Sequence, residues 1–220
     1  MISSYIEILL LSFFVSGTAL VISSIIGVPL GAWIGFKRFR ARRFLTALLY
    51  TGMGLPPVVV GLFVYLLLSR SSFVGQLNLS FIPQLFTPSA MILAEVIIAL
   101  PLVIGLTMSA VMEVPAGMQH QIRSLGATGP QTVKAILWEA RRGVILAVIA
   151  GFGSIISEVG AVMLVGGNVE GQTRVLTTAI VLETRKGNFS LALWLGITLL
   201  VIAFLINFGV LLLQGKVAEE

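Results

Sequence analysis

Long apolar runs separated by short polar segments dominate the chain. Five runs reach or exceed the ~18 residues that a membrane-crossing helix needs. They are Tyr5–Phe36, Phe44–Leu68, Phe86–Met112, Gly143–Val165 and Leu191–Leu212. Because the apolar residues are continuous rather than alternating, the runs indicate helices. The pattern predicts an all-α, polytopic membrane protein with about five transmembrane helices, forming a single domain over residues 1–220.

One long polar segment, residues 113–142, separates the third run from the fourth. Within it, Met118, Ile122 and Leu125 recur at helical spacing and share one face of a short amphipathic helix. Gly126 suits the end of that helix, because glycine accepts positive φ, and Pro130 suits the first turn of a second helix. Such a helix–Gly–helix loop suits contact with a cytoplasmic motor protein. On this segment alone, an ordinary helix lying at the membrane surface remains the alternative.

Basic residues indicate the orientation of the chain. Cytoplasmic loops of membrane proteins carry the excess of Lys and Arg. Ten lie on one side of the predicted membrane, and these are Lys37, Arg38, Arg40, Arg42, Arg43, Arg123, Lys134, Arg141, Arg142 and Lys216. Four lie on the other side, and these are Arg70, Arg174, Arg185 and Lys186. The N-terminus is therefore expected outside, and the C-terminus and the 113–142 loop inside.

Composition argues against most catalytic chemistry. The chain is 57% hydrophobic, contains neither Cys nor Asp, and has one histidine, His120, in the polar loop. Thiol chemistry, Asp-based metal sites and a membrane-depth Ser–His pair are therefore not expected. A phosphate-binding loop ending in Gly-Lys-Ser/Thr is also missing from the sequence. We expect no catalytic site, no metal and no cofactor in this chain, and no nucleic-acid partner, because the net charge of +5 reflects loop topology.

Two carboxylates fall within apolar runs. Glu158 follows Ser157 and precedes Gly160, in a small polar patch of an otherwise apolar helix. Burying an ionised group at that depth costs several kcal/mol, so a role in a cavity or gate is favoured over a purely structural, hydrogen-bonded carboxyl. Glu95 is the weaker candidate, because it is expected nearer the outer surface and within reach of water.

A glycine-rich segment follows the fourth run on the outer side. Gly166, Gly167 and Asn168 precede Arg174 and Thr177, so backbone N–H groups, a cation and a hydroxyl occur close together. This combination suits an oxyanion or a docking partner. A simple turn leading into an outer helix is the alternative, and the run Arg174–Thr184 has helical spacing.

Three stretches carry a family resemblance. Gly54–Gly61 reads Gly-Leu-Pro-Pro-Val-Val-Val-Gly, Glu158–Asn168 is followed by Gly171–Ile180, and Leu182–Phe189 contains Glu-Thr-x-Lys-Gly-Asn. The first resembles the Leu-Pro-Pro-x-Val-x-Gly segment of type I ATP-binding-cassette (ABC) importer permeases. The second resembles the outer gate of the molybdate and tungstate branch, and the third looks like the tungstate permeases in particular.

The cytoplasmic coupling motif of that family maps onto the polar loop. Gly126 and Ile136 match it in place, whereas His120, Gln121 and Ile122 replace Glu-Ala-Ala and Trp138-Glu139 replaces Leu-Pro. The resemblance implies that this loop contacts an ATPase. The implied coupling residues are Met118, His120, Ile122, Arg123, Leu125, Gly126, Ala127 and Ile136.

The resemblance implies an oxyanion importer subunit in the cytoplasmic (inner) membrane of a prokaryote. Tungstate is the first expectation, with molybdate and sulfate as alternatives. The implied partners are a second copy of the chain, two cytoplasmic ATPase subunits that hold ATP and Mg²⁺, an anion-binding protein outside, and membrane lipid. The expected pathway or gate residues are Pro56, Pro57, Ser157, Glu158, Gly160, Gly166, Gly167, Asn168, Arg174 and Thr177. An ATP-independent anion carrier or channel is the alternative from another class, although inverted repeats typical of carriers are not evident.

Overall fold

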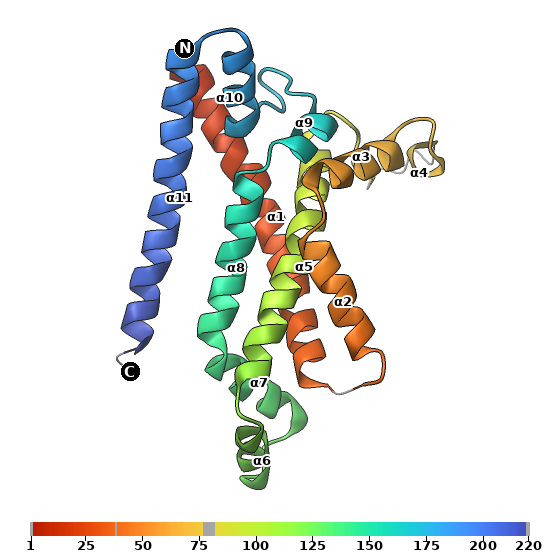
Figure 1. The fold of residues 1–220 in the computed structure, drawn as a ribbon, viewed down its shortest axis with the longest axis vertical. Coiled ribbons are helices and arrows are strands. Elements are labelled where there is room, and N and C mark those ends of the chain that lie inside the picture. Colours follow the sequence, from red (N-terminus) through yellow and green to blue (C-terminus); the bar gives the residue numbers. More distant parts are fainter. Residues whose placement is uncertain (1, 38, 77–81, 219–220) are drawn as a thin grey trace.

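A computed structural model describes residues 2–37, 39–76 and 82–218 of the chain, so Arg38 lies outside the described residues. The described residues form α-helices joined by turns (Figure 1). In chain order the helices are α1 (Ile2–Phe36), α2 (Arg42–Met53), α3 (Pro57–Leu68), α4 (Phe73–Gln76), α5 (Pro88–Glu113), α6 (Ala116–Ser124), α7 (Gly129–Glu139), α8 (Arg141–Ile156), α9 (Gly160–Gly166), α10 (Leu176–Arg185) and α11 (Phe189–Ala218).

Three helices are long and apolar enough to cross a membrane by themselves. These are α1 over Tyr5–Phe36, α5 over its whole length, and α11 over Phe189–Gly209. The second and fourth predicted spans are bent pairs, with 97° between α2 and α3 and 58° between α8 and α9. Counting each pair as one crossing gives five, as the apolar pattern predicts. The two ends of the chain then lie at opposite ends of the bundle (Figure 1).

Proline chemistry explains the first bend. Pro57 begins α3, and Pro56 before it is extended, with φ −61° and ψ 122°. A residue that precedes proline is driven away from helical geometry, and proline itself cannot donate the helical hydrogen bond. The Pro56-Pro57 pair therefore stops α2 and restarts the chain in a new direction.

The second bend contains no proline. Helix α8 ends at Ile156, and the hydroxyl of Ser157 turns back to donate to the carbonyl of Gly153 at 2.9 Å. Helix α9 then begins at Gly160. The expectation that Glu158 lies inside a continuous helix is therefore wrong, because Glu158 occupies the break.

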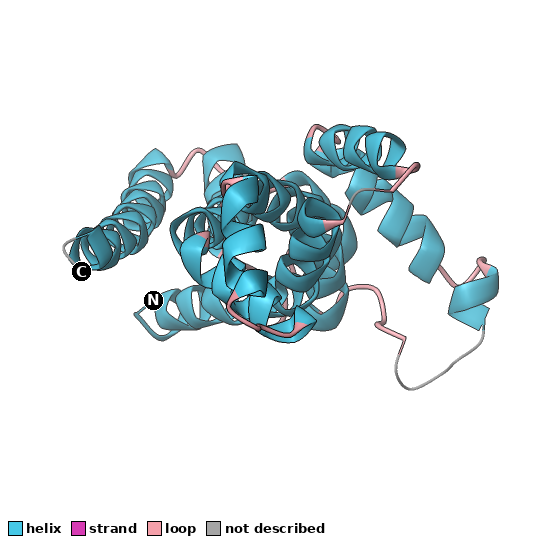
Figure 2. Ribbon diagram, turned by 90° about the horizontal axis from the view of Figure 1, so that it is seen from below, coloured by secondary structure: helices cyan, strands magenta, loops and turns pink. Residues whose placement is uncertain are grey.

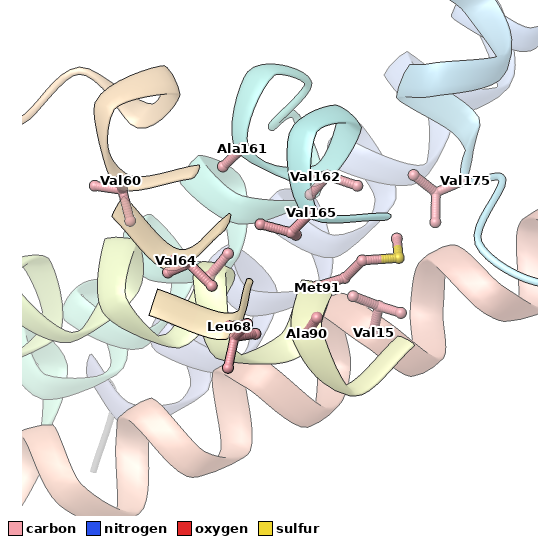
Figure 3. Packing of buried hydrophobic residues seen from close by; sticks show 11 residues of the cluster. Val15, Val60, Val64, Leu68, Ala90, Met91, Ala161, Val162, Val165 and Val175 are labelled. Carbon is pink, nitrogen blue, oxygen red and sulfur yellow. The ribbon is translucent and has the colours of Figure 1, made fainter. Parts of the chain in front are cut away.

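Helix α5 is the centre of the bundle, with α1 along one side and α8 along another (Figure 1). Contact with α1 is close because of glycine: a Cβ on Gly31 would lie 2.5 Å from the carbonyl oxygen of Ile104. At the end of the bundle opposite α6 and α7, α3 and α9 fold over α5 and enclose an apolar core with Val64, Met91 and Val165 at its centre (Figure 3). These three side chains are fully buried, so the bent halves are packed parts of the fold.

Helix α11 is the least covered of the long helices. Only 11% of its most apolar stretch is buried within the chain, against 50% for α5. Viewed along the bundle, α11 stands to one side of the central helices (Figure 2). Its large exposed apolar side chains, including Phe204 and Leu205, suit contact with lipid or with another apolar surface.

Candidate coupling and translocation sites

Helices α6 and α7 project from the end of the bundle opposite α9 and α10 (Figure 1). Gly126 follows α6 with φ +86°, and its N–H donates to the carbonyl of Arg123 at 3.0 Å. Helix α7 begins at Gly129, with Pro130 in its first turn, and the N–H of Thr128 donates to the side chain of Gln131 at 2.8 Å. The predicted helix–Gly–helix shape is confirmed, and a left-handed glycine is its turning point.

One side of this loop is anchored in the bundle. Ile136 of α7 is fully buried, in a cluster with Ala32 of α1 and with Ala110 and Val111 of α5. Ile122 of α6 packs against the same cluster. Burying an Ile side chain contributes about 1.5–3 kcal/mol. Ile136 therefore joins α7 to both α1 and α5 through a buried contact.

The other side of the loop is exposed. Leu125 is 87% exposed and Trp138 is 69% exposed, although both are large and apolar. His120 and Arg123 are also exposed, whereas Met118 and Ala127 are half-buried. Met118, Ile122 and Leu125 therefore do not form one outward face, because Ile122 packs inward. Leu125 and Trp138 are the exposed, large apolar side chains of the loop that a docking partner could cover.

The two bends lie against each other. A Cβ on Gly160 would meet Val58 at 2.5 Å, and a Cβ on Gly61 would lie 2.5 Å from the Cα of Ala161. Helices α3 and α9 thus pack backbone against backbone at the points where they begin. Pro56 and Pro57, which precede Val58, therefore lie near Gly160, and their role in a gate stays a prediction.

A cavity of about 250 Å³ lies at the α2–α3 bend. It is lined by residues of α2–α3, α5 and α8, including Met53, Pro56, Pro57, Ile98, Leu102 and Ser154. Among the described residues that line it, none is charged. A cavity of this composition attracts an anion only weakly.

Glu158 has hydrogen-bonded partners at the second bend. Its Oε1 accepts the N–H of Ala161 at 2.9 Å, and its carbonyl oxygen accepts the hydroxyl of Thr177 at 2.8 Å. The side-chain bond satisfies an N–H in the first turn of α9, and the main-chain bond ties the bend to α10. The geometry therefore matches the hydrogen-bonded alternative for this carboxyl, at the position where a gate is expected. Ser157 beside it is exposed.

The glycine-rich loop after α9 is bonded largely to itself. The hydroxyl of Thr173 donates to the carbonyl of Gly166 at 2.6 Å, and Gly167 and Asn168 both have positive φ, +71° and +53°. Arg174 lies 3.2 Å from Glu170, and its side chain is 16% exposed. In this conformation the loop is a turn leading into α10, and its only arginine is paired with a carboxylate.

The segment that joins α10 to α11 is also held by a carboxylate. Glu183 accepts hydrogen bonds from Lys186 at 2.7 Å and from the side chain of Asn188 at 3.0 Å. The bond from Lys186 is the main cause that lowers the pKa of Glu183. Gly187, with φ +78°, completes the turn. The stretch that resembles the tungstate permeases is thus a hydrogen-bonded corner at the same end of the bundle as α10.

A buried polar cluster was not predicted from the sequence. Glu95 is 3% exposed and its Oε1 accepts the hydroxyl of Ser16 at 3.2 Å, so the expectation that it reaches outer water is wrong. Ser12 of the same face of α1 accepts the N–H of Leu176 at 2.8 Å. A cavity of about 10 Å³, enough for one water, separates Glu95 from Glu158. The four-residue spacing of Ser12 and Ser16, which places both hydroxyls on one face of α1, is the sequence feature that could have indicated this cluster.

Comparison with known proteins supports the same class. Residues 27–219 match the family described as the binding-protein-dependent transport system inner membrane component. A probable anion ABC transporter permease protein of Haloferax volcanii is 40% identical, over 92% of this chain and 87% of its own. The tungstate uptake system permease protein TupB of Peptoclostridium acidaminophilum is 40% identical, over 95% of this chain and 90% of its own. A molybdenum transport system permease protein ModB of Azotobacter vinelandii is 27% identical, over 84% and 83%.

Solved structures share the fold. The MetNI methionine ABC transporter in its inward-facing conformation gives a TM-score of 0.72 at 21% identity, covering 95% of this chain and 92% of that one. An amino acid ABC transporter gives a TM-score of 0.65 at 17% identity, covering 97% and 92%. The chain belongs to the family of binding-protein-dependent transport system inner membrane components, and its fold is that of a type I ABC importer permease.

Proposed function

We propose that this chain is the permease subunit of an ABC importer that conducts tungstate across the cytoplasmic membrane, driven by separate ATPase subunits. The observation that carries the proposal is the 40% identity to a tungstate uptake permease over 95% of the chain. Molybdenum permeases are more distant, at 27% identity, and so is a sulfate permease of Salmonella typhimurium, at 28%. Molybdate and sulfate are therefore the secondary candidates.

The proposed orientation follows from the basic residues. The α1–α2 turn and helices α6 and α7 lie at one end of the bundle, and α10 lies at the other (Figure 1). The first end carries most of the Lys and Arg residues, so the positive-inside rule assigns it to the cytoplasm. The N-terminus is then outside, the C-terminus inside, and α6–α7 faces the compartment that holds ATP.

In this proposal α6 and α7 receive the movement of the ATPase. Each ATPase subunit binds ATP and Mg²⁺ and covers Leu125 and its neighbours. The buried contact of Ile136 then carries the displacement to α1 and α5. Because α5 also packs against α8 and α9, the displacement reaches the paired bends. The chain makes no covalent change to the ion and needs no cofactor of its own.

The proposed pathway lies between two copies of the chain, beside the bends. An anion-binding protein delivers the ion from outside, near α9 and α10. The uncharged cavity at the α2–α3 bend supports passage rather than storage, because a cationic site would hold a dianion and slow its release. Pairing of Arg174 with Glu170 neutralises the cation of the outer loop, so this loop also would not hold the ion tightly.

Co-purification with the ATPase tests the proposed coupling. Proline cannot adopt φ +86°, so Gly126→Pro is expected to abolish the complex. Gly117→Ala is the matched control, since Gly117 lies in α6 with open space around its Cα. A Met118→Glu/Leu125→Glu double variant should also lose the complex, whereas Gln121→Glu, exposed on the same helix, should keep it.

Two results would refute this assignment. The first is a wild-type chain that never binds an ATPase yet moves oxyanion into liposomes, which would indicate a carrier or channel. The second is an ATPase complex that survives both Gly126→Pro and the Met118→Glu/Leu125→Glu double variant, which would place the motor elsewhere on the chain.

A further inference from the structure

A second, polar cavity lies where the spans end on the side of α6. Its volume is about 410 Å³, and it is enclosed by the end of α1, the start of α2, the end of α5 and the first turns of α6. The lining residues with polar side chains are Arg42, Gln119 and His120, and Phe36 and Met112 add apolar walls. The cavity at the α2–α3 bend has no charged lining residue, so the two cavities differ in chemistry.

The cavity has cationic surroundings without internal counterions. Arg42 donates to the carbonyl of Gly35 at 3.1 Å through one nitrogen, which fixes the guanidinium and leaves its other donors available. Lys37, Arg40 and Arg43 belong to the same turn. Within the described residues, neither Arg42 nor any of these three forms an ion pair. An unneutralised cluster of this kind favours an anionic ligand.

An exposed aromatic and apolar surface adjoins the same turn. The rings of Trp33 and Phe39 lie 5.4 Å apart, and Lys37 Nζ lies 5.5 Å from the centre of the Trp33 ring. Trp33 is 46% exposed, and Phe44, two residues after Arg42, is 72% exposed. Tryptophan with a neighbouring cation is typical of the headgroup level of a bilayer. A ligand here meets cations at one end and apolar surface at the other.

We propose that this cavity binds the phosphate of an anionic phospholipid from the cytoplasmic leaflet, with the acyl chains along the exposed faces of α1 and α2. Clusters of Lys and Arg immediately beyond a span, and basic pockets between spans, are suited to such headgroups. A free anion would use the cationic wall but not the adjoining apolar faces. The assignment to the cytoplasmic leaflet rests on the proposed orientation, but it does not depend on which ion is transported.

The bound lipid would join the first two spans to the coupling loop. Gln119 and His120 are residues of α6, whereas Arg42 belongs to α2 and Phe36 to α1. A headgroup in the cavity therefore contacts both the membrane-embedded part and the helix proposed to meet the ATPase. Anionic lipid would hold α6 in its position against the spans.

Native mass spectrometry of the full chain in mild detergent tests the proposal. The protein is mixed with equimolar phosphatidylglycerol and phosphatidylcholine, and retained lipid is counted. Wild type should retain phosphatidylglycerol preferentially. Arg42→Gln should weaken retention about fivefold or more. Gln119→Glu should do the same, although it leaves the bond from Arg42 to Gly35 intact and adds a negative charge to the cavity.

Arg185→Gln is the matched control, because it removes one exposed cation at the opposite end of the bundle and should retain lipid as wild type does. Equal retention of the two lipids by wild type, or full retention by both cavity variants, would overturn the proposal. Displacement of phosphatidylglycerol by an equal concentration of inorganic phosphate would indicate a small-anion site instead. Displacement by added ATPase would assign the cavity to an acidic side chain of that partner. Because no transport is measured, failure here is distinguishable from failure of the proposed import function.

Discussion

Replacing Ile136 with Ala is expected to disconnect the coupling loop from the spans. Ile136 is fully buried, and the substitution removes three carbon atoms from its side chain. At ~0.8 kcal/mol for each buried CH₂, the transfer term alone is about 2.4 kcal/mol. A cavity term is added, because the neighbours Ala32, Ala110 and Val111 are short side chains on long helices and cannot fill the space. A total of ~3–4 kcal/mol lies within the range for such substitutions.

A loss of that size has a measurable consequence for coupling. If it falls on the contact between α7 and the spans, the docked population drops by roughly 150-fold or more relative to the undocked one. The assay is tungstate uptake per ATP hydrolysed in proteoliposomes that contain the chain, its ATPase and the binding protein, together with the melting temperature of the complex. Uptake per ATP should fall sharply, whereas ATP hydrolysis continues.

Val133→Ala is the control, since Val133 lies on the same helix and is 37% exposed. It should change neither quantity by much. An Ile136→Ala complex that melts early yet keeps its full uptake per ATP would refute transmission through this contact. A complex that is unchanged in both measurements would refute the packing argument itself.

Other substitutions probe the paired bends. Gly61→Leu should separate α3 from α9, because even the Cβ of the new side chain would lie 2.5 Å from the Cα of Ala161. Tungstate uptake should be lost while the chain remains in the membrane, and normal uptake would contradict the close packing. Thr177→Val removes the donor to the carbonyl of Glu158 and should lower the free energy of unfolding by about 1–2 kcal/mol in a thermal melt, whereas Thr177→Ser should restore it. An unchanged stability of the Val variant would contradict the hydrogen bond. Glu158→Gln keeps an acceptor for the N–H of Ala161 and should keep tungstate uptake, whereas Glu158→Ala should lower uptake. Equal losses of uptake in both variants would contradict this and would give the negative charge itself a role.

Local patterns in the sequence were sufficient for much of the fold. The five apolar runs correspond to three single helices and two bent pairs that are long and apolar enough to cross a membrane, because helix length and hydrophobicity are properties of contiguous residues. Gly126 was identified correctly as the turning point of the polar loop, because a positive φ favours glycine. The break in the second span coincides with the Pro56-Pro57 pair, and its 97° angle depends on how α3 packs against α9.

The break in the fourth span could not be predicted in the same way. Residues 157–159 contain no proline, and the polar patch around Glu158 was equally consistent with a continuous helix. The bend is stabilised by Thr177, whose hydroxyl reaches the carbonyl of Glu158 from nineteen residues further along the chain. A tertiary contact of that kind leaves no periodic trace in the sequence.

Burial of Glu95 has the same origin. Its partner Ser16 is 79 residues away in the sequence, and α1 is the helix that covers it. Arg174 illustrates a different limit: its type and position suggested an anion site, but Glu170, four residues earlier, pairs with it. The presence of a cation was readable from the sequence, whereas its availability was decided by the folded loop.

Tungstate accumulation in sealed proteoliposomes tests whether the chain is the permease of an ATP-driven importer. The vesicles contain the chain and its ATPase, with the ATPase side and ATP enclosed and the anion-binding protein supplied outside. We expect tungstate to accumulate against its gradient only when ATP, the ATPase and the binding protein are all present. Tungstate entry that proceeds without ATP or without the ATPase would contradict it and would identify the chain as a carrier or channel.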